Sequence, residues 1–116
     1  RLPRDYGFTF RMSEEEKAEV TAHHNALLHE AETAVLAGKT DLLILDEFFA
    51  AFHTGLLDRD DAERFVRSDA VKKIELVLTG RDPGQRFIDA ADYVSEIRAV
   101  KHPYEQGIPA RKGIEY

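Results

Sequence analysis

Acidic and polar side chains follow two apolar stretches of this sequence, and their types suit the binding of a metal ion together with phosphate. Asp46 and Glu47 come directly after the apolar run at 42–45, and Thr79 and Arg81 come at the end of a second run. Carboxylate oxygens are the ligands that Mg²⁺ prefers, and a guanidinium group pairs well with phosphate oxygens. Apolar strands that end in acids are also common because Asp caps the helix that follows. The pattern therefore fits a metal-triphosphate site, and it also fits a helix cap.

The tripeptide Gly38-Lys39-Thr40 looks like the end of a phosphate-binding loop, but its context argues against that function. Such a loop follows a strand, opens a helix, and carries a further glycine at the position that Thr33 occupies here. In this sequence a helix is predicted before the tripeptide and a strand after it. We therefore do not expect a phosphate-binding loop at 38–40.

A long helix is predicted from Ser13 to about Ala37. Ser13 and Glu16 form a capping-box pattern at its start, and Gly38 is a typical residue just past a helix end. One stripe of this helix is expected to be buried because it repeats at helical spacing. The stripe consists of Val20, His24, Leu27, Ala31 and Ala34 with Val35. His23 and His24 are adjacent, so they point to different sides of the helix and make a poor metal site.

Three stretches are predicted to be strands. The run at 42–45 is unbroken and apolar, as in a strand that is buried on both faces of a parallel sheet. The second strand is expected at 74–80, and the third, more amphipathic, at 93–100. Strands that alternate with helices indicate a single α/β domain over residues 1–116, with an ordered C-terminal loop at 101–116.

The connections between these strands are predicted to be helical. Residues 48–52 fit the buried face of a helix, and the helical region breaks near Gly55. Asp82 is expected to cap a short helix, with Pro83 at its first position and Gln85 closing the capping box.

Ligands of parallel sheets bind beyond the carboxyl ends of the strands. By that rule the first strand supplies Asp46 and Glu47, the second supplies Thr79 and Arg81, and the third supplies residues 101–102.

The composition excludes several classes of function. A net charge of −6 argues against a general nucleic-acid surface, and no apolar run approaches the length of a membrane span. The absence of cysteine excludes disulfides and thiolate chemistry. No signal peptide is visible, so a cytoplasmic location is expected. Because the chain opens with RLPRDYGFTF and no Met, we expect it to be a segment that lacks an upstream portion.

Two aromatic residues near the start form a further candidate site. Phe8 and Phe10 flank Thr9 in a stretch that the neighbouring Pro3 and Gly7 mark as a loop. They fit either a hydrophobic anchor or the wall of an apolar ligand pocket.

These motifs occur together, in the same order, in one known family: YGFTF, then DLLILDE, then VLTGR, then ADYVSEIRAVKHPYEQGIPARKGIEY. On these residues the chain resembles the ATP:corrinoid adenosyltransferases of the cobalamin-biosynthesis (cob(I)yrinic acid a,c-diamide) type. The ending VKHPY-x-x-GI-x-A-x-KGIEY is the most specific part, and the match is to the family's C-terminal two-thirds. The resemblance implies a P-loop NTPase-like, mostly parallel sheet with flanking helices. Its first strand and phosphate loop are absent from this chain, and 42–47 is its Walker B strand.

The resemblance implies transfer of the 5′-deoxyadenosyl group of ATP to Co(I) of a corrinoid, with release of triphosphate. It implies ATP, Mg²⁺ and a corrinoid as ligands, a homodimer, and a flavoprotein-type reductant as a candidate partner. By resemblance Glu47, with Asp46 beside it, attends the metal. Arg81 and Thr79 are our additional candidates for contact with the ATP phosphates.

The resemblance also gives the two aromatics a role. In the family, aromatic residues of a GFTW-like motif pack under the corrin ring and displace its lower axial ligand, which makes Co(II) easier to reduce. Phe8 and Phe10 would form this lower face, although Phe10 stands where the family pattern usually has Trp.

Two other functions fit the same residues. One is a non-catalytic corrinoid-binding or dimerisation module that has lost its ATP site, and the other is a generic P-loop ATPase fragment. A strand followed by a phosphate-binding loop upstream of Arg1 would favour the enzyme over the binding module.

Overall fold

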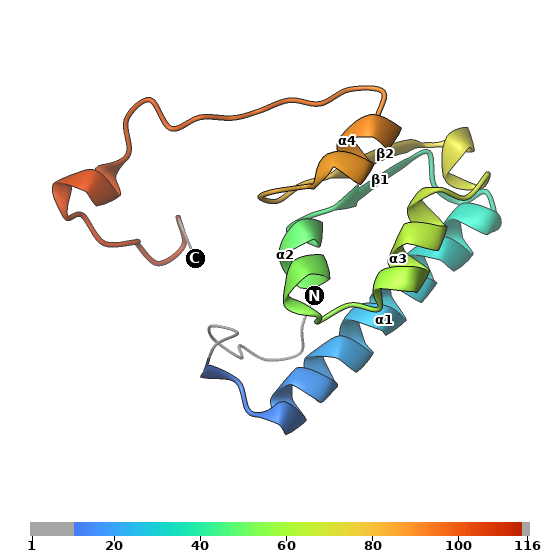
Figure 1. Cartoon of the computed structure of the whole chain (residues 1–116), viewed down its shortest axis with the longest axis horizontal. Coiled ribbons are helices and arrows are strands. Elements are labelled where there is room, and N and C mark those ends of the chain that lie inside the picture. Colours follow the sequence, from blue (N-terminus) through green and yellow to red (C-terminus); the bar gives the residue numbers. More distant parts are fainter. Residues whose placement is uncertain (1–10, 115–116) are drawn as a thin grey trace.

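The computed structural model describes residues 11–114, which form a packed part followed by a long exposed C-terminal segment (Figure 1). In chain order the elements are α1 (Glu14–Leu36), β1 (Leu42–Leu45), α2 (Phe48–Thr54), α3 (Arg59–Val66), the 3₁₀ turn η2 (Val71–Lys73), β2 (Glu75–Leu78), α4 (Gln85–Ala90) and the 3₁₀ turn η3 (Pro103–Gln106). The fold is therefore mixed α/β, as predicted. None of the helices within 11–114 is both long and apolar enough to cross a membrane.

Helix α1 begins where the sequence predicts. Ser13 Oγ accepts a hydrogen bond from the Glu16 N–H at 3.1 Å, and Glu16 Oε2 accepts one from the Ser13 N–H at 2.9 Å, which completes the capping box. Its buried side chains are Val20, Leu28 and Val35, while His24, Leu27, Ala31 and Ala34 are half-buried. The predicted stripe is thus confirmed at its two ends, but Leu28 replaces Leu27 as the buried leucine.

The end of α1 explains the GKT tripeptide. Gly38 has a φ of 67°, and its N–H donates to the carbonyl of Val35 at 3.0 Å. The N–H of Lys39 donates to the carbonyl of Ala34, also at 3.0 Å. This pair of bonds is the Schellman ending, which favours glycine at its left-handed position. The tripeptide therefore terminates a helix.

Strands β1 and β2 pair in parallel, with Leu42 opposite Glu75 and Leu45 opposite Leu78. Side chains alternate between the two faces of a sheet. The inward side chains pack against the helices: Leu43, Leu45, Leu76 and Leu78. On the other face Leu42, Ile44 and Val77 are 54%, 56% and 41% exposed. The prediction that 42–45 is buried on both faces is therefore wrong, because the described core packs against one face only.

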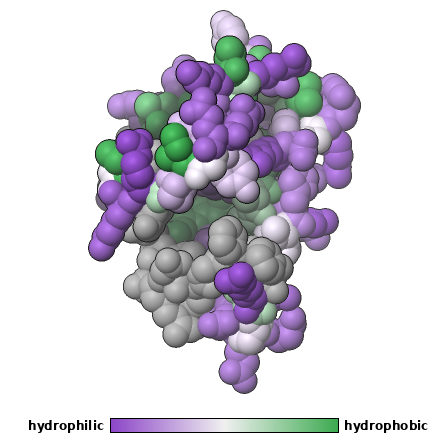
Figure 2. Space-filling model, turned by 90° about the vertical axis from the view of Figure 1, so that its left-hand side faces the viewer, coloured by the Kyte–Doolittle hydropathy of each residue, from purple (hydrophilic) through white to green (hydrophobic). Residues whose placement is uncertain are grey.

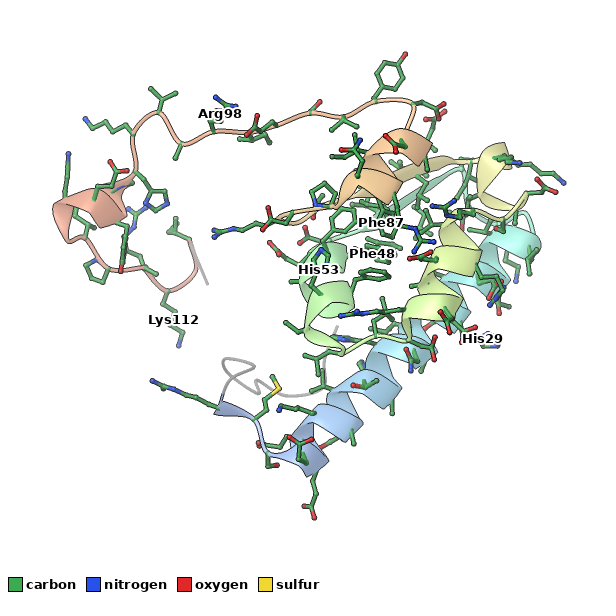
Figure 3. The ribbon with its side chains drawn as sticks, viewed as in Figure 1. His29, Phe48, His53, Phe87, Arg98 and Lys112 are labelled. Carbon is green, nitrogen blue, oxygen red and sulfur yellow. The ribbon has the colours of Figure 1, made fainter. Side chains whose placement is uncertain are left out.

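The core is built around phenylalanine side chains. Phe48, Phe49 and Phe52 of α2 are buried, and Phe65 of α3 is completely enclosed. Phe87 of α4 packs edge-on against α2, with its ring centroid 5.2 Å from those of Phe49 and Phe52 (Figure 3). The predicted buried face at 48–52 is confirmed.

The break between α2 and α3 lies at Gly55, as predicted, where φ is 72°. Asp58 then caps α3, since its Oδ1 accepts from the Asp61 N–H at 2.9 Å. Arg64 of α3 forms an ion pair with Glu32 of α1 at 2.7 Å, which ties the two helices together.

The third predicted strand does not form. Residues 93–100 are irregular and exposed, with Ile97 and Val100 at 98% and 99%. Their charged side chains are used locally, as Arg98 donates to Glu96 at 2.8 Å. A strand needs a neighbouring edge to satisfy its backbone groups, and this segment runs away from β2 (Figure 1). The sheet within 11–114 therefore has two strands.

The predicted cap of the short helix is also wrong. Asp82 has a φ of 51°, and Gly84 is the residue that precedes α4, which begins at Gln85. The Gln85 side chain donates to Asp89 at 2.6 Å, so it faces along the helix and not back to a cap.

The segment after α4 makes local turns and has no buried side chain between 91 and 114. At η3 the ring nitrogen Nδ1 of His102 accepts from the Tyr104 N–H at 3.1 Å, and Gly107 ends the turn with a φ of 73°. Figure 2 shows the face that is on the left in Figure 1, where the C-terminal segment lies, and apolar side chains are scattered there among polar ones. The ordered C-terminal loop at 101–116 stays a prediction.

Candidate functional site

The structure brings together two strand ends that the sequence marks as a site. The Thr79 hydroxyl donates to Asp46 Oδ1 at 2.6 Å, and Thr79 Oγ1 accepts a hydrogen bond from the Glu47 N–H at 2.9 Å. The Thr79 N–H continues the sheet ladder to the carbonyl of Leu45 at 3.2 Å. Because the strands are parallel and in register, their carboxyl ends place these three polar residues side by side.

In the turn after β1, neither of the two carboxylates caps the helix that follows. Glu47 has a φ of 52° and precedes α2, yet no side chain caps this helix. The Phe49 N–H instead lies 3.5 Å from the carbonyl of Thr79. Left-handed backbone is uncommon for a residue other than glycine, and such residues are a reason to look for function. The helix-cap interpretation of Asp46 and Glu47 is therefore not supported here.

These carboxylates fit a magnesium ion that is shared with a phosphate chain. Mg²⁺ is usually held by one or two carboxylates together with substrate phosphates and water, and not by a full protein cage. Asp46 keeps Oδ2 outside its bond to Thr79, and the Glu47 side chain is exposed. Within residues 11–114 there is no cluster of three metal-ligating side chains, so any ion here would depend on a ligand for its remaining oxygens.

The turn after β2 carries Arg81 to the same end of the sheet. Gly80 has a φ of 136°, and a Cβ built there would lie 3.0 Å from Phe49 Cβ. Only glycine fits this close approach of the chain to α2. Arg81 is exposed, one residue beyond Gly80 and two beyond Thr79. The backbone thus brings Arg81 to the edge that carries the oxygen ligands, and this combination of residue types suits a metal-bound polyphosphate.

The comparisons with known proteins show the family of this chain. The family model described as ATP:corrinoid adenosyltransferase BtuR/CobO/CobP matches residues 3–116. The chain belongs to the ATP:corrinoid adenosyltransferase family.

Individual relatives carry the same name. A corrinoid adenosyltransferase of Sinorhizobium sp is 28% identical over 110 residues, which are 95% of this chain and 50% of the relative. One of Pseudomonas aeruginosa is 36% identical over 75 residues, 65% of this chain and 36% of the relative. One of Escherichia coli K12 is 26% identical over 110 residues, 95% of this chain and 55% of the relative. The chain thus spans about half the length of those relatives that it matches almost end to end. No solved structure matches it significantly.

Two further predicted residues of this family member do not join the edge. Lys101 and His102 were expected at the end of a third strand, but they lie in the exposed segment away from β1 and β2 (Figure 1). Phe8 and Phe10 lie outside the described residues. His24 is half-buried and bonds the carbonyl of Leu56 through Nδ1 at 2.8 Å, so it has a structural partner.

Sequence reasoning missed His53. Its Nε2 lies 2.6 Å from the carbonyl of Asp82, in the turn that carries Arg81. The available signal was its spacing, because His53 falls one helical turn after Phe49 and so shares the face of α2 that meets the end of β2.

Two ion pairs away from this edge shift the pKa of their carboxyl groups. The pKa of Glu32 is lowered, chiefly by its hydrogen bond to Arg64. The pKa of Asp69 is lowered, chiefly by its hydrogen bond to Lys72. Both shifts favour the charged carboxylate and concern the surface of the helical layer.

Proposed function

We propose that this chain forms part of an enzyme that transfers the 5′-deoxyadenosyl group of ATP to a corrinoid. In this reaction the Co(I) lone pair attacks C5′, the C5′–O bond breaks, and its electron pair leaves with triphosphate. The observation that carries the proposal is the edge where Asp46, Glu47 and Thr79 meet beside Arg81, in a chain matched by the family over residues 3–116.

The acidic side of this edge would attend the metal. When bound, Mg²⁺ would neutralise charge on the triphosphate leaving group. Glu47 would supply an exposed carboxylate, and Asp46 would supply Oδ2, directly or through water. Thr79 is a candidate phosphate contact, but its hydroxyl proton already goes to Asp46. The bond better supports a role for Thr79 in orienting the Asp46 carboxylate.

The remaining roles extend the family's chemistry to this chain. Arg81 would pair with phosphate oxygens, while Phe8 and Phe10 would pack against the lower face of the corrin and exclude water from cobalt. A homodimer, a flavoprotein-type reductant and a cytoplasmic location belong to the same proposal. Since the chain spans about half of relatives such as that of Sinorhizobium sp, we expect no turnover from these 116 residues alone. Within 11–114 no helix follows a stretch with the GxxxxGK[ST] sequence of a phosphate-binding loop.

A non-catalytic role is the second candidate. The open sheet face formed by Leu42, Ile44 and Val77 is apolar and exposed, as expected of a piece that completes a larger assembly. In that case the chain would bind corrinoid or a second copy of itself without ATP chemistry.

Glu47→Gln tests the catalytic proposal. The variant is made in a protein that joins this chain to the additional part found in its longer relatives. Adenosylation should fall strongly, and the Mg²⁺ concentration for half-maximal rate should rise, because a neutral amide is a weaker ligand for a hard cation. Corrinoid binding should change little. The measurement is the rate of adenosylcorrinoid formation from Co(I) corrinoid at varied Mg²⁺.

Glu75→Gln is the matched control, since Glu75 is an exposed carboxylate at the opposite end of the same sheet. It should leave the metal dependence unchanged. The same Mg²⁺ dependence in Glu47→Gln as in the parent would remove Glu47 from the metal site.

A further inference from the structure

Helix α2 runs alongside the chain segment that leaves β2, and it contacts this segment at several points. The Phe49 N–H approaches the carbonyl of Thr79 at 3.5 Å, and Gly80 lies against the Phe49 side chain. One helical turn later His53 Nε2 lies 2.6 Å from the carbonyl of Asp82. Arg81 therefore sits in a short stretch with a contact to α2 on each side.

His53 is itself held in place. Its ring lies near that of Phe49, with centroids 6.4 Å apart and planes inclined by 27°. Its own carbonyl accepts from Arg59 Nη2 at 2.9 Å. A carbonyl oxygen can only accept a hydrogen bond, so the Nε2 that faces Asp82 must carry the proton. Figure 3 places the ring on the side of the packed part that faces the C-terminal segment.

We propose that His53 is a positioning residue for Arg81. The turn at 80–84 has left-handed backbone at Gly80, Asp82 and Gly84, and glycine adds conformational freedom at both ends. The contact from Nε2–H to the Asp82 carbonyl fixes the middle of this turn. It thereby directs Arg81 to the edge where Asp46 and Glu47 would hold a metal-bound triphosphate. The inference rests on the proposed function for the ligand, but the fixed turn can be tested without one.

The test of the turn is ¹⁵N relaxation of the 116-residue chain without ligand. His53→Phe keeps an aromatic ring against Phe49 and removes the donor. Backbone order parameters at Arg81 and Asp82 should fall from about 0.85 to below about 0.6, while those of β1 and β2 stay unchanged.

Two further variants sharpen this measurement. His53→Gln keeps an N–H donor at similar reach and should retain the order of Arg81 and Asp82. His29→Phe is the same change of histidine to phenylalanine on α1, away from the turn (Figure 3). It should leave the order of Arg81 and Asp82 unchanged. An ordered turn in His53→Phe, or a loss in His53→Gln as large as in His53→Phe, would overturn the inference.

The link to function is tested in the joined protein of the Glu47→Gln experiment, by titrating it with inorganic triphosphate and Mg²⁺. His53→Phe should weaken binding about fivefold, as expected for one hydrogen bond. The double variant with Arg81→Ala should bind no more weakly than Arg81→Ala alone, because His53 acts through Arg81. Independent, additive losses would overturn the positioning role. If the parent binds no triphosphate, the proposed phosphate role of Arg81 fails, and the relaxation data still decide whether His53 fixes the turn.

Discussion

The stretches 42–45 and 93–100 both have the composition of strands, yet only the first is one. LLIL pairs with β2 on one side and packs Leu43 and Leu45 against a cluster of phenylalanine rings. YVSEIRAV has apolar residues at suitable positions, but Ile97 and Val100 are almost fully exposed. The difference shows that β-propensity is the fit of side chains to a neighbour, so the same pattern without a neighbour stays irregular.

The largest expected effect is the difference in the free energy of unfolding between a substitution in the packed part and one in the exposed segment. Phe65→Ala should destabilise the fold by about 3–5 kcal/mol, because it empties the centre of the core. Ile97→Ala should change stability by less than about 0.5 kcal/mol, since the side chain already lies in water. Urea unfolding followed by circular dichroism measures both. If Phe65→Ala is unfolded from the start, Phe65→Leu should give a measurable loss of about 1 kcal/mol. Equal losses for Phe65→Ala and Ile97→Ala would mean that the segment packs in solution.

A smaller effect is expected from glycines with left-handed backbone in the two regions. Gly80→Ala should cost about 1–3 kcal/mol, because the new Cβ is strained and would approach Phe49 to 3.0 Å. Gly113 also has a positive φ, but a Cβ there would meet nothing within 4 Å. Gly113→Ala should therefore leave the unfolding midpoint unchanged, because its turn can relax into water. A thermal melt of each variant tests this, and a stable Gly80→Ala would show that α2 and β2 can separate.

The smallest effect comes from surface ion pairs. Glu32 and Arg64 join α1 to α3, whereas Glu96 and Arg98 lie two residues apart in the exposed segment. The pKa of Glu32 in the folded chain is below its ordinary value of 4.5 because Arg64 donates a hydrogen bond to it. Its contribution to stability is therefore full above about pH 4.5 and is lost as pH falls through the lowered pKa.

Glu32→Gln should lower the thermal midpoint at pH 7 by no more than a few degrees, since exposed ion pairs contribute little. The difference from the parent should shrink towards acid pH, and Glu96→Gln should show no difference at any pH. A deficit in Glu32→Gln that grows on acidification would assign the effect to packing.

The parts of the fold that sequence predicts are those governed by local signals. Ser13 with Glu16, and Gly38, fix the ends of α1 through bonds within a few residues, and Gly55 breaks the next helical region in the same way. The failure at 93–100 concerns pairing, which depends on which edge is present in space. The prediction that Leu42 and Ile44 are buried failed for the same reason, because an apolar run does not show which part of the chain will cover it.

The candidate site divides similarly. The rule that ligands bind at the carboxyl ends of parallel strands was enough to place Asp46, Glu47 and Thr79 together. It could not predict the bond from Thr79 to Asp46, nor that from His53 to Asp82 across 29 positions of sequence. Both depend on side-chain direction after the helices pack.

The Schellman ending of α1 has a consequence for any anion that approaches Gly38-Lys39-Thr40. Phosphate loops bind because their backbone N–H groups are vacant until the ligand arrives. Here the N–H groups of Gly38 and Lys39 already donate to the carbonyls of Val35 and Ala34. An anion would have to displace two helix-ending bonds to reach them, and the released carbonyls would repel it. The same three letters that signal phosphate affinity elsewhere therefore describe, in this chain, a stretch of backbone whose donors are already engaged.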